Sequence, residues 1–439
     1  GQRRIAVSSR IPGFYKLDPA GRLARLAKME LPRDAEAPPF RAEAFEQGLS
    51  LDQADLMVEN VVSTFGLPNA VAVNFLVNGE DRLVPMVVEE PSVVAAVSHM
   101  AKLARRSGGF RAESDPSHMI GQIQLVDVRD PDACVDRLTR ALPRLRQEAR
   151  GVHRRLEARG GGLRDFEIRQ LTYDEPGRPI EHMVVLHLVL DVVDAMGANM
   201  VNTLAEHLAP TVAEVTGERV GLRILSNLAD RRCSRAWVRL SPDCLGESPE
   251  HGREVAERIA EAWRFAWADP YRATTHNKGV MNGIDAVAIA TGNDWRAIEA
   301  GVHAYAARDG QYRPLTRWEI DEAGFLVGTI EVPLQFGTVG GPIKVHPTVQ
   351  ANFALLGVAT ARELSAIAAA VGLAQNLGAL KALATEGIQY GHMRMHARTV
   401  AATAGATPDE VGPVTVELVR QRDFSVDHAK DVIERLRAK

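Results

Sequence analysis

The order of predicted elements between residues 121 and 225 constrains the fold more than any other feature of the chain. Apolar runs bounded by turn residues predict strands there, and apolar positions at helical spacing predict helices. In chain order these are a strand over 122–128, a helix over 130–150, strands over 166–172 and 181–193 around Pro176-Gly177, a helix over 194–215 and a strand over 219–225. This strand–helix–strand–strand–helix–strand order is typical of a ferredoxin-like α+β sandwich. We expect it to be inserted between two halves of a larger domain.

The segments on either side of this unit are mainly helical. Helices are predicted over 51–64, 93–106, 250–267, 295–308 and 360–371, with hairpins over 70–88 around Asn78-Gly79 and over 318–332. Beyond residue 391 two or three short helices follow, enough for a small mobile appendage. The prediction is an α+β fold with a large, mainly helical domain (1–116 and 230–385), an inserted ferredoxin-like domain (117–229) and a helical C-terminal flap (386–439).

Composition narrows the class of protein. The chain has 439 residues, which is longer than a domain with a single hydrophobic core usually is, so two or three domains are expected. The formal net charge of −4 provides no general attraction to nucleic acid or to an anionic membrane. The three cysteines lack metal-ligand spacing and fit a reducing compartment. No apolar run reaches about 18 residues, so we expect no membrane span. From the cysteines we expect no metal site and a cytoplasmic location.

Four short polar segments interrupt apolar or small-residue stretches, and each has a structural alternative. Glu90, in Glu89-Glu90-Pro91-Ser92, could act as an acid in a cleft or merely cap a helix. His276-Asn277-Lys278-Gly279 suggests backbone laid against a ligand, but a solvated loop has the same composition. Asp294 follows an apolar run over 286–290, interpreted as a strand, and could be only an N-cap. His392 alone is weak support for any site.

A fifth segment, Asp194-Ala195-Met196-Gly197-Ala198-Asn199, is the candidate for binding a cofactor. Small residues at a helix start let backbone amides approach a pyrophosphate, which the helix dipole favours. Close packing of two helices would need the same small residues. The chain has no G-x-G-x-x-G between a strand and a helix, and Gly160–Gly162 does not qualify, so the sequence argues against a Rossmann domain.

Taken together, the polar segments resemble the 3-hydroxy-3-methylglutaryl-coenzyme A (HMG-CoA) reductases. The matching segments follow the family's order along nearly the whole chain, and they are most similar to the bacterial class II enzymes. They are Glu59–Val62, Glu89–Ser92, Asp194–Asn199, His276–Asp285, Thr291–Arg296, Gly340-Gly341, Gly372–Ala379 and Glu386–His392. The resemblance implies interconversion of HMG-CoA with mevalonate and CoA by two hydride transfers from a nicotinamide cofactor.

The resemblance also implies a role for individual residues. Glu90, Lys278, Asp294 and His392 match the family's catalytic set, with Lys278 at the oxyanion, Glu90 as proton donor, Asp294 supporting both, and His392 protonating the leaving thiolate. Further matches bind ligands. Ser92, Arg272 and Asn282 would hold the HMG moiety, Gln375 and Ala379 the CoA side, and Asp194, Met196, Gly197, Ala198, Asn199, Asn227 and His153 the cofactor. The large domain would then bind substrate, the inserted domain the cofactor, and the flap would carry His392.

The choice of cofactor is less determined than the reaction. His153 stands where NAD-selective relatives have an Asp for the ribose hydroxyls, and Arg154 and Arg155 follow it. This favours room for a 2′-phosphate, whereas similarity elsewhere to an NAD-using enzyme favours NAD(H). We expect NAD(H), with NADP(H) as the alternative, and a homodimer or higher symmetric oligomer through helix 51–64. Two other functions stay open, a CoA-thioester hydrolase or lyase without a redox cofactor, and an inactive CoA-binding relative.

Overall fold

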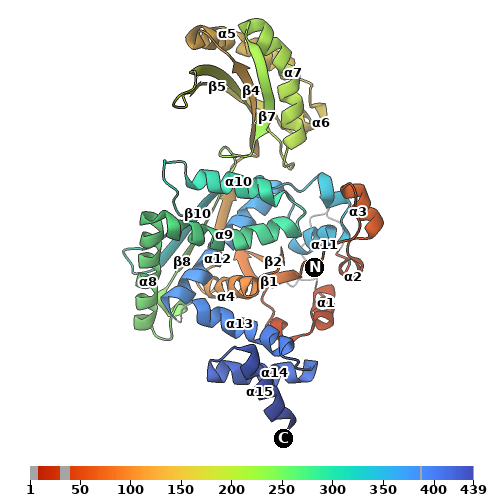
Figure 1. Ribbon diagram of the computed structural model, residues 1–439, viewed down its shortest axis with the longest axis vertical. Helices are drawn as coiled ribbons and strands as arrows, with labels where there is room; N and C mark the ends of the chain where they lie inside the picture. The colour runs from red at the N-terminus through yellow and green to blue at the C-terminus, as the bar shows by residue number, and fades with distance from the viewer. Residues whose placement is uncertain (1–7, 30–39, 386–387, 439) are drawn as a thin grey trace, which may run out of the picture.

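The structure, a computed structural model, describes residues 8–29, 40–385 and 388–438. Helices and antiparallel strands are mixed along the described chain, so the predicted mixed composition is confirmed. The described strands form one two-stranded hairpin and two four-stranded sheets. Figure 1 shows one four-stranded sheet at one end of the molecule and the last two helices at the other end.

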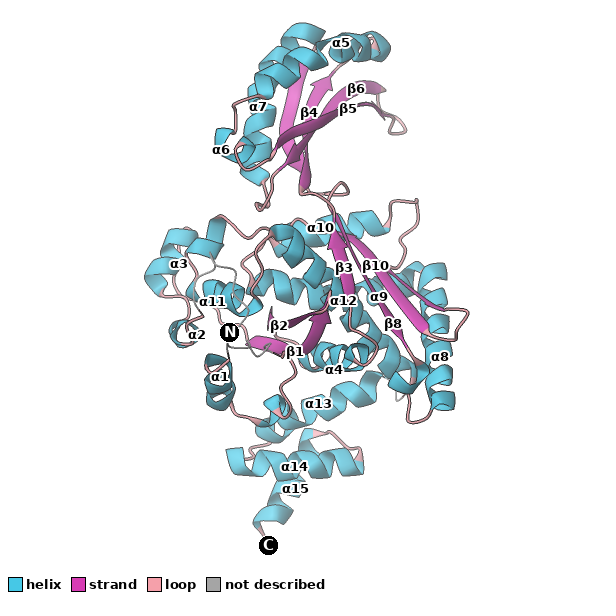
Figure 2. Cartoon of the chain, turned by 180° about the vertical axis from the view of Figure 1, so that it is seen from behind, coloured by secondary structure: helices cyan, strands magenta, loops and turns pink. Residues whose placement is uncertain are grey.

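Residues 118–226 form the four-stranded sheet at that end. Its elements are β4 (His118–Val126), α5 (Pro131–Ala149), α6 (Arg154–Glu157), β5 (Gly162–Tyr173), β6 (Glu181–Asp191), α7 (Ala198–Thr216) and β7 (Arg219–Ser226). The strands pair antiparallel in the order β5-β6-β4-β7, with α5 and α7 against one face (Figure 2). The predicted order of strands and helices is therefore present, and the strand order is that of a ferredoxin-like sheet. Apolar residues between 119 and 229 form a core of their own.

The rest of the chain surrounds the hairpin and the second sheet. The hairpin is β1 (Asn69–Val77) and β2 (Glu80–Val87), and the sheet has the order β3-β8-β10-β9, from Arg111–Ser114, Cys233–Leu240, Leu326–Pro333 and Thr316–Ile320. The helices and short 3-10 segments of this part are η1 (Phe14–Lys16), α1 (Pro19–Ala27), α2 (Glu43–Gln47), α3 (Leu51–Met57), α4 (Val93–Arg105), η2 (Pro242–Cys244), α8 (Pro249–Ala268), α9 (Pro270–Ala290), α10 (Trp295–Ala306), η3 (Gly341–Lys344), α11 (Pro347–Leu356) and α12 (Ala361–Ala384). One continuous core joins the sheet, the hairpin, α4, α9 and α12.

Helix α12 runs through this core, which explains its apolar composition. By length and composition it could cross a membrane, and it is the one helix in the described part of the chain that could. However, 72% of its apolar window is buried inside the protein. A helix that is apolar on all sides and packed in this way is a core helix.

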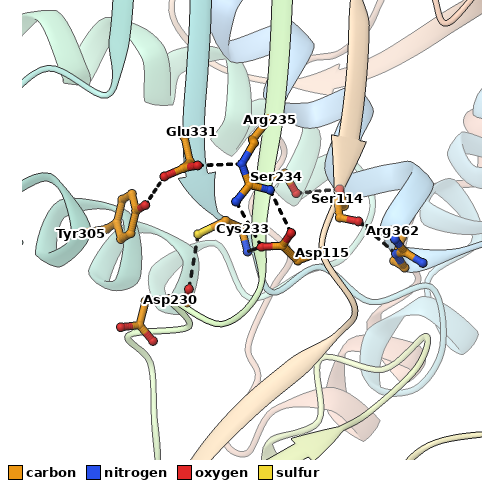
Figure 3. A network of polar contacts seen from close by, with 9 residues as sticks. All are labelled: Ser114, Asp115, Asp230, Cys233, Ser234, Arg235, Tyr305, Glu331 and Arg362. Carbon is orange, nitrogen blue, oxygen red and sulfur yellow. Dashed lines mark hydrogen bonds and ion pairs between the residues drawn. The ribbon is translucent and has the colours of Figure 1, made fainter.

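A polar network joins the start of β8 to the ends of β3 and β10, where the chain leaves and re-enters the small sheet (Figure 3). Arg235 on β8 contacts Asp115, after β3, at 2.8 Å and Glu331 on β10 at 2.6 Å. Tyr305 on α10 donates a hydrogen bond to Glu331. Burial raises the pKa of the neighbouring Cys233 thiol to about 11, so this cysteine stays protonated.

The last three helices, α13 (Ile388–Thr403), α14 (Pro408–Gln421) and α15 (Val426–Arg437), pack mainly on one another. Their buried apolar residues lie between 397 and 433 and form a cluster separate from the main core. Both ribbon views place α14 and α15 at the opposite end from the small sheet (Figures 1 and 2).

Three predicted assignments were wrong, one of them in part. Helix 51–64 ends at Met57, because Val58 is extended and Asn60 is left-handed with φ of 60°. The β-branched residues that follow have low helix propensity, and no packed partner in the described part of the chain offsets that, since Val58 and Val62 are exposed. Residues 286–290 are not a strand but the last turns of α9, and residues 276–279 are helical rather than a loop. A short apolar run does not by itself distinguish a strand from a buried helix.

Candidate active site

Helix α9 begins at an efficient cap and is anchored by buried polar residues. Asp269 accepts hydrogen bonds from the amides of Tyr271 and Arg272, and Pro270 stands at the first helical position. Asn277 is fully buried, donates to the carbonyl of Arg313 and accepts from the amide of Leu315. Asn277 therefore belongs to the framework of the helix and not to an open surface.

His276 is the second anchor. Its Nε2 lies 2.6 Å from the hydroxyl of Thr316, which itself donates to Asn376. Because that hydroxyl uses its proton on Asn376, Nε2 of His276 must carry the donated hydrogen. Burial, with a smaller effect of the Arg272 charge, lowers the pKa of His276 to about 3. His276 is thus a neutral structural histidine at physiological pH.

Lys278 is the member of the motif that faces outward. Its Nζ lies 2.8 Å from Oε2 of Glu90, with side-chain exposures of 59% for Lys278 and 29% for Glu90. Glu90 lies in the turn between β2 and α4, and this turn reaches α9 because β2 packs beside that helix. The structure therefore brings together two of the four predicted catalytic residues, from positions 188 residues apart.

Ser92 completes the same turn. It precedes α4 with φ of 77°, a left-handed conformation that is uncommon for a residue other than glycine. Its hydroxyl is buried and has no hydrogen-bond partner among the described residues. A strained residue with an unsatisfied hydroxyl beside Glu90 is a reasonable point of contact for a polar ligand.

Of the two remaining members of the predicted catalytic set, only the side chain of Asp294 is described, and it lies elsewhere. Asp294 is exposed and caps α10, where its carboxylate accepts from the amide of Ala297 at 3.0 Å. Within the described ranges, no hydrogen bond or ion pair joins Asp294 to Lys278 or Glu90. The backbone of His392 belongs to α13, whereas its side chain lies outside what the structure describes. Residues 386 and 387, at the start of the matching segment Glu386–His392, also lie outside the described residues.

The predicted substrate residues lie on α9 and α12. Asn282 follows Lys278 by one helical turn, so both belong to the same face of α9. Helix α12 lies against this part of α9, since a Cβ on Gly283 would be 3.1 Å from Cβ of Gln375. Gln375 is 6% exposed and its Oε1 has no partner in the part of the chain that is described. Ala379 is one turn further along α12 and is partly exposed.

Arg272 lies about three turns before Asn282 along α9 and is half-buried. Burial lowers the pKa of its guanidinium, but the arginine remains charged at neutral pH. An Arg in this environment is suited to binding a carboxylate.

The candidate cofactor segment forms the turn into α7. Gly197 caps this helix with φ of 97°, and a Cβ there would be 2.5 Å from Val192. Asn199 is exposed, and the first turn of α7 contains no acidic residue. An open helix N-terminus without a carboxylate fits an anionic group such as a pyrophosphate. The helix begins at Ala198 and not at Asp194 as expected, which leaves Asp194–Gly197 free to contact the large part of the protein.

Two further predicted cofactor residues border this segment. His153 precedes α6, and its Nε2 lies 2.8 Å from the carbonyl of Met200 in the first turn of α7. Arg154 and Arg155 follow it and are exposed. Asn227 lies on the connection back to the large part, with its carbonyl against Gly301 of α10.

The loop that carries Asp294 is coupled to the cofactor segment through Gly337. Asn293 accepts from the amide of Gly337 at 2.7 Å and donates to its carbonyl at 3.1 Å. The next amide, Thr338, donates to the carbonyl of Asp194 at 2.8 Å. A Cβ on Gly337 would lie 2.8 Å from the nitrogen of Met196. Asp294 is thus held near the cofactor segment even though it does not contact Lys278.

A cavity of about 1620 Å³ opens beside Asn293 and Trp295. It extends along the first helices and is lined by five basic side chains, Arg10, Arg22, His99, Lys102 and His346. Neither Glu90 nor Lys278 lines it. The volume of the cavity is large enough for a long, phosphorylated ligand.

Sequence reasoning missed two buried polar groups. Arg232 follows two other charged residues in Asp230-Arg231-Arg232, so nothing in the local sequence distinguishes it from a surface residue, yet it is 3% exposed. Asp285, two turns beyond Lys278 on α9, meets Glu299 on α10. Burial and this second carboxyl raise the pKa of Asp285 to about 9, so the pair holds one proton. Within the described residues no group of three His, Cys, Asp or Glu side chains could hold a metal ion.

Comparison with known proteins shows the family to which the chain belongs. Residues 25–397 match the family model for hydroxymethylglutaryl-coenzyme A reductase. A 3-hydroxy-3-methylglutaryl-coenzyme A reductase of Archaeoglobus fulgidus is 50% identical over 438 residues, covering 100% of this chain and 97% of the relative. A probable 3-hydroxy-3-methylglutaryl-coenzyme A reductase of Borreliella burgdorferi is 32% identical and covers 87% of this chain and 86% of its own.

Two solved structures from Streptococcus pneumoniae have the same fold. The first, a 3-hydroxy-3-methylglutaryl-coenzyme A reductase, has a TM-score of 0.80 at 42% identity and covers 97% of this chain and 99% of its own. The second, a class II enzyme bound to NADPH in open conformations, has a TM-score of 0.78 at 42% identity and covers 96% of this chain and 100% of its own.

The fold and these matches define an oxidoreductase. A thioester hydrolase, a lyase or an inactive relative is not favoured, because the matches are to reductases and extend over nearly the whole chain. The chain belongs to the hydroxymethylglutaryl-coenzyme A reductase family, within its class II.

Proposed function

We propose that Glu90, Lys278, Asp294 and His392 carry out the interconversion of HMG-CoA and mevalonate, on the outward face of α9. The observation that carries this proposal is the contact of Lys278 with Glu90 at 2.8 Å. His276 and Asn277, which precede Lys278 in the motif, are buried and structural, so Lys278 is the cation of the motif that faces the Glu90 turn.

The chemistry requires these groups. When bound, the nicotinamide cofactor supplies the hydrides. Lys278 stabilises the oxyanion that forms at the reacting carbonyl, since a fixed cation there lowers the barrier most. Glu90 donates the proton that the resulting alkoxide needs, and His392 protonates the thiolate as it leaves. Arg272, Ser92 and Asn282 bind the HMG moiety, and Gln375 and Ala379 line the path of CoA.

The neighbouring Glu89 provides a matched control for Glu90, because the two carboxylates are adjacent and Glu89 is exposed. Glu90→Gln keeps the shape and an oxygen for Lys278 but has no acidic proton. It should lower turnover by about two decades or more while HMG-CoA still binds, and Glu89→Gln should have little effect. Equal, small losses in both variants would remove Glu90 from the mechanism.

The small sheet with α5 to α7 is proposed to bind the cofactor, at Asp194–Asn199, with Asn227 and His153 beside it. The cofactor is NAD(H) or NADP(H). Asn199→Asp tests the location, since it changes one exposed side chain by charge alone. A carboxylate in the first turn favours the helix but repels a pyrophosphate. Nucleotide affinity should fall about tenfold or more while stability is kept, and Asn199→Ser should retain affinity. Unchanged nucleotide affinity in Asn199→Asp would exclude this site.

The terminal helices are proposed to act as a lid that brings His392 over the site. Their core is separate from the main core, so their docking should be weak and reversible. Closure would exclude water while the aldehyde intermediate is held, and reopening would allow the cofactor to exchange. Hydrogen exchange should show greater protection of α13 to α15 with HMG-CoA and nucleotide bound. Equal protection with and without ligands would contradict a lid.

A homodimer at minimum is proposed from the apolar surface at residues 51–65. Leu56, Val62 and Phe65 are 83%, 89% and 90% exposed, which is unusual for large apolar side chains so close in sequence. Sedimentation should show a dimer or larger particle at micromolar concentration. Phe65→Lys should shift it toward monomer, whereas a wild-type monomer with full activity would contradict the proposal.

A further inference from the structure

Arg232 is a buried cation with no carboxylate of its own. It is 3% exposed, and among the described residues no ion pair reaches its guanidinium. Burial lowers its pKa to about 10, and the charges of Asp191 and Asp194 oppose that effect, so it stays protonated at neutral pH. Both carboxylates have other partners, as Asp191 contacts Arg164 and Asp194 accepts from the amide of Ala361. A desolvated charge of this kind is costly and calls for an explanation.

The guanidinium instead binds three backbone carbonyls from two parts of the protein. Nη1 lies 3.2 Å from the carbonyl of Ala195 and 3.3 Å from that of Met196, both in the turn before α7. Nη2 lies 2.5 Å from the carbonyl of Phe336, in the segment after β10. Arg232 is itself on the connection that returns from the small sheet. It therefore joins the candidate cofactor segment to the large part at a single buried point.

The orientation of these carbonyls also sets the orientation of the N–H groups in the same peptides. In a trans peptide the N–H points opposite to the C=O. The amides of Met196 and Gly197 belong to the two peptides that Arg232 binds, so they point away from it. Gly337, next to Phe336, covers the Met196 amide and is paired with Asn293. One chain of contacts thus runs from Arg232 through the cofactor segment to the residue before Asp294.

We propose that Arg232 is a positioning residue for hydride transfer, which fixes the Asp194–Gly197 turn relative to the Asn293-Asp294 loop. The proposal rests on the proposed location of the cofactor at this turn. Arg232 does not touch the reacting atoms but acts through three carbonyls. The planar guanidinium of Arg232 donates to all three carbonyls at once. A lysine side chain at the same position is shorter and ends in a compact ammonium, so it could not reach all three.

The test uses Arg232→Lys, which keeps the charge and changes the geometry. The KM for the nucleotide should rise about tenfold, and the KM for HMG-CoA should stay within about twofold. The primary deuterium isotope effect on kcat with 4-deuterated nucleotide should increase, because hydride transfer becomes more rate-limiting. A role in stability alone would change neither the ratio of the two KM values nor the isotope effect.

Arg235→Lys is the matched control. Arg235 lies three residues further along, on β8, but it contacts the carboxylates of Asp115 and Glu331 and not the cofactor segment (Figure 3). Its variant should leave the nucleotide KM unchanged. If Arg232→Lys fails to fold, Gly337→Ala displaces the Met196 amide from the other side, since its Cβ would be 2.8 Å from that nitrogen. It should give the same nucleotide-specific defect.

Two outcomes would overturn the proposal. One is an unchanged nucleotide KM and isotope effect in folded Arg232→Lys or Gly337→Ala. The other is an equal rise in both KM values, or the same defect in Arg235→Lys, which would mean general support of the fold. Failure of the cofactor location is recognised separately, because Asn199→Asp would then keep full nucleotide affinity whatever Arg232→Lys does.

Discussion

Replacement of Lys278 by alanine should separate the chemistry of the site from the stability of the fold. The ion pair with Glu90 is short, at 2.8 Å, but Lys278 is 59% exposed, and exposed pairs contribute only about 0–1 kcal/mol to folding. Loss of a donor at a developing oxyanion costs about 2.7–4 kcal/mol of activation free energy, or two to three decades in kcat. Lys278→Ala should therefore fold almost normally and lose at least about a hundredfold in turnover.

The assay is nucleotide oxidation at saturating HMG-CoA, with thermal unfolding measured in parallel. Arg253→Ala is the control, because Arg253 pairs with Glu250 on the surface of α8 and is similarly exposed at 60%. It should change neither quantity measurably. If Lys278→Ala keeps near-normal turnover, or loses activity only because it unfolds, Lys278 does not act at the oxyanion.

Three further predictions concern single residues. His392→Gln should lower the turnover of HMG-CoA by about two decades more than the turnover of free mevaldehyde, because only the thioester releases a thiolate. Equal losses on the two substrates would make His392 structural. His153→Asp should shift the ratio of kcat/KM toward NADH over NADPH, because a carboxylate accepts ribose hydroxyls and repels a 2′-phosphate; an unchanged ratio would place the determinant elsewhere. The raised pKa of Asp285 means that the folded protein keeps a proton there that the unfolded chain releases, so this group's contribution to stability is lost as pH rises from about 4 to about 9. Asp285→Asn should therefore flatten the fall of Tm over that range, and an identical pH profile of Tm would contradict the shared proton.

Local signals accounted for much of the fold. Asn78 and Gly79 adopt φ of 53° and 80°, the left-handed pair that such a hairpin turn requires. The small sheet was predictable because its strands and helices alternate with clear turn residues between them. Strands β3 and β8 were not predicted, and β3 is only four residues long. Its pairing with β8 depends on residues more than a hundred positions away.

The site was harder to predict in its arrangement than in its members. The residues around Lys278 look polar enough for a loop, yet His276 and Asn277 are buried because Thr316 and Leu315 supply their hydrogen-bond partners. Those partners lie about 40 residues further along the chain, so no local pattern shows them. Arg232 is a similar case, because its three partners are backbone carbonyls, which every residue has, so the sequence does not indicate them. Helix 51–64 was predicted too long for the opposite reason, because its apolar residues suggested a packed helix, whereas Leu56 and Val62 are exposed and no surface among the described residues covers them.

The central claim is that this chain reduces a thioester with a nicotinamide cofactor at the Glu90–Lys278 site. The most direct test is the stoichiometry of one reaction, with NAD(P)H oxidation followed by absorbance and CoA release followed by a thiol reagent. Reduction through an aldehyde predicts two nucleotides oxidised for each thiol released, with NADH or NADPH. Release of CoA from HMG-CoA without nucleotide oxidation would contradict the account and indicate hydrolysis or cleavage instead.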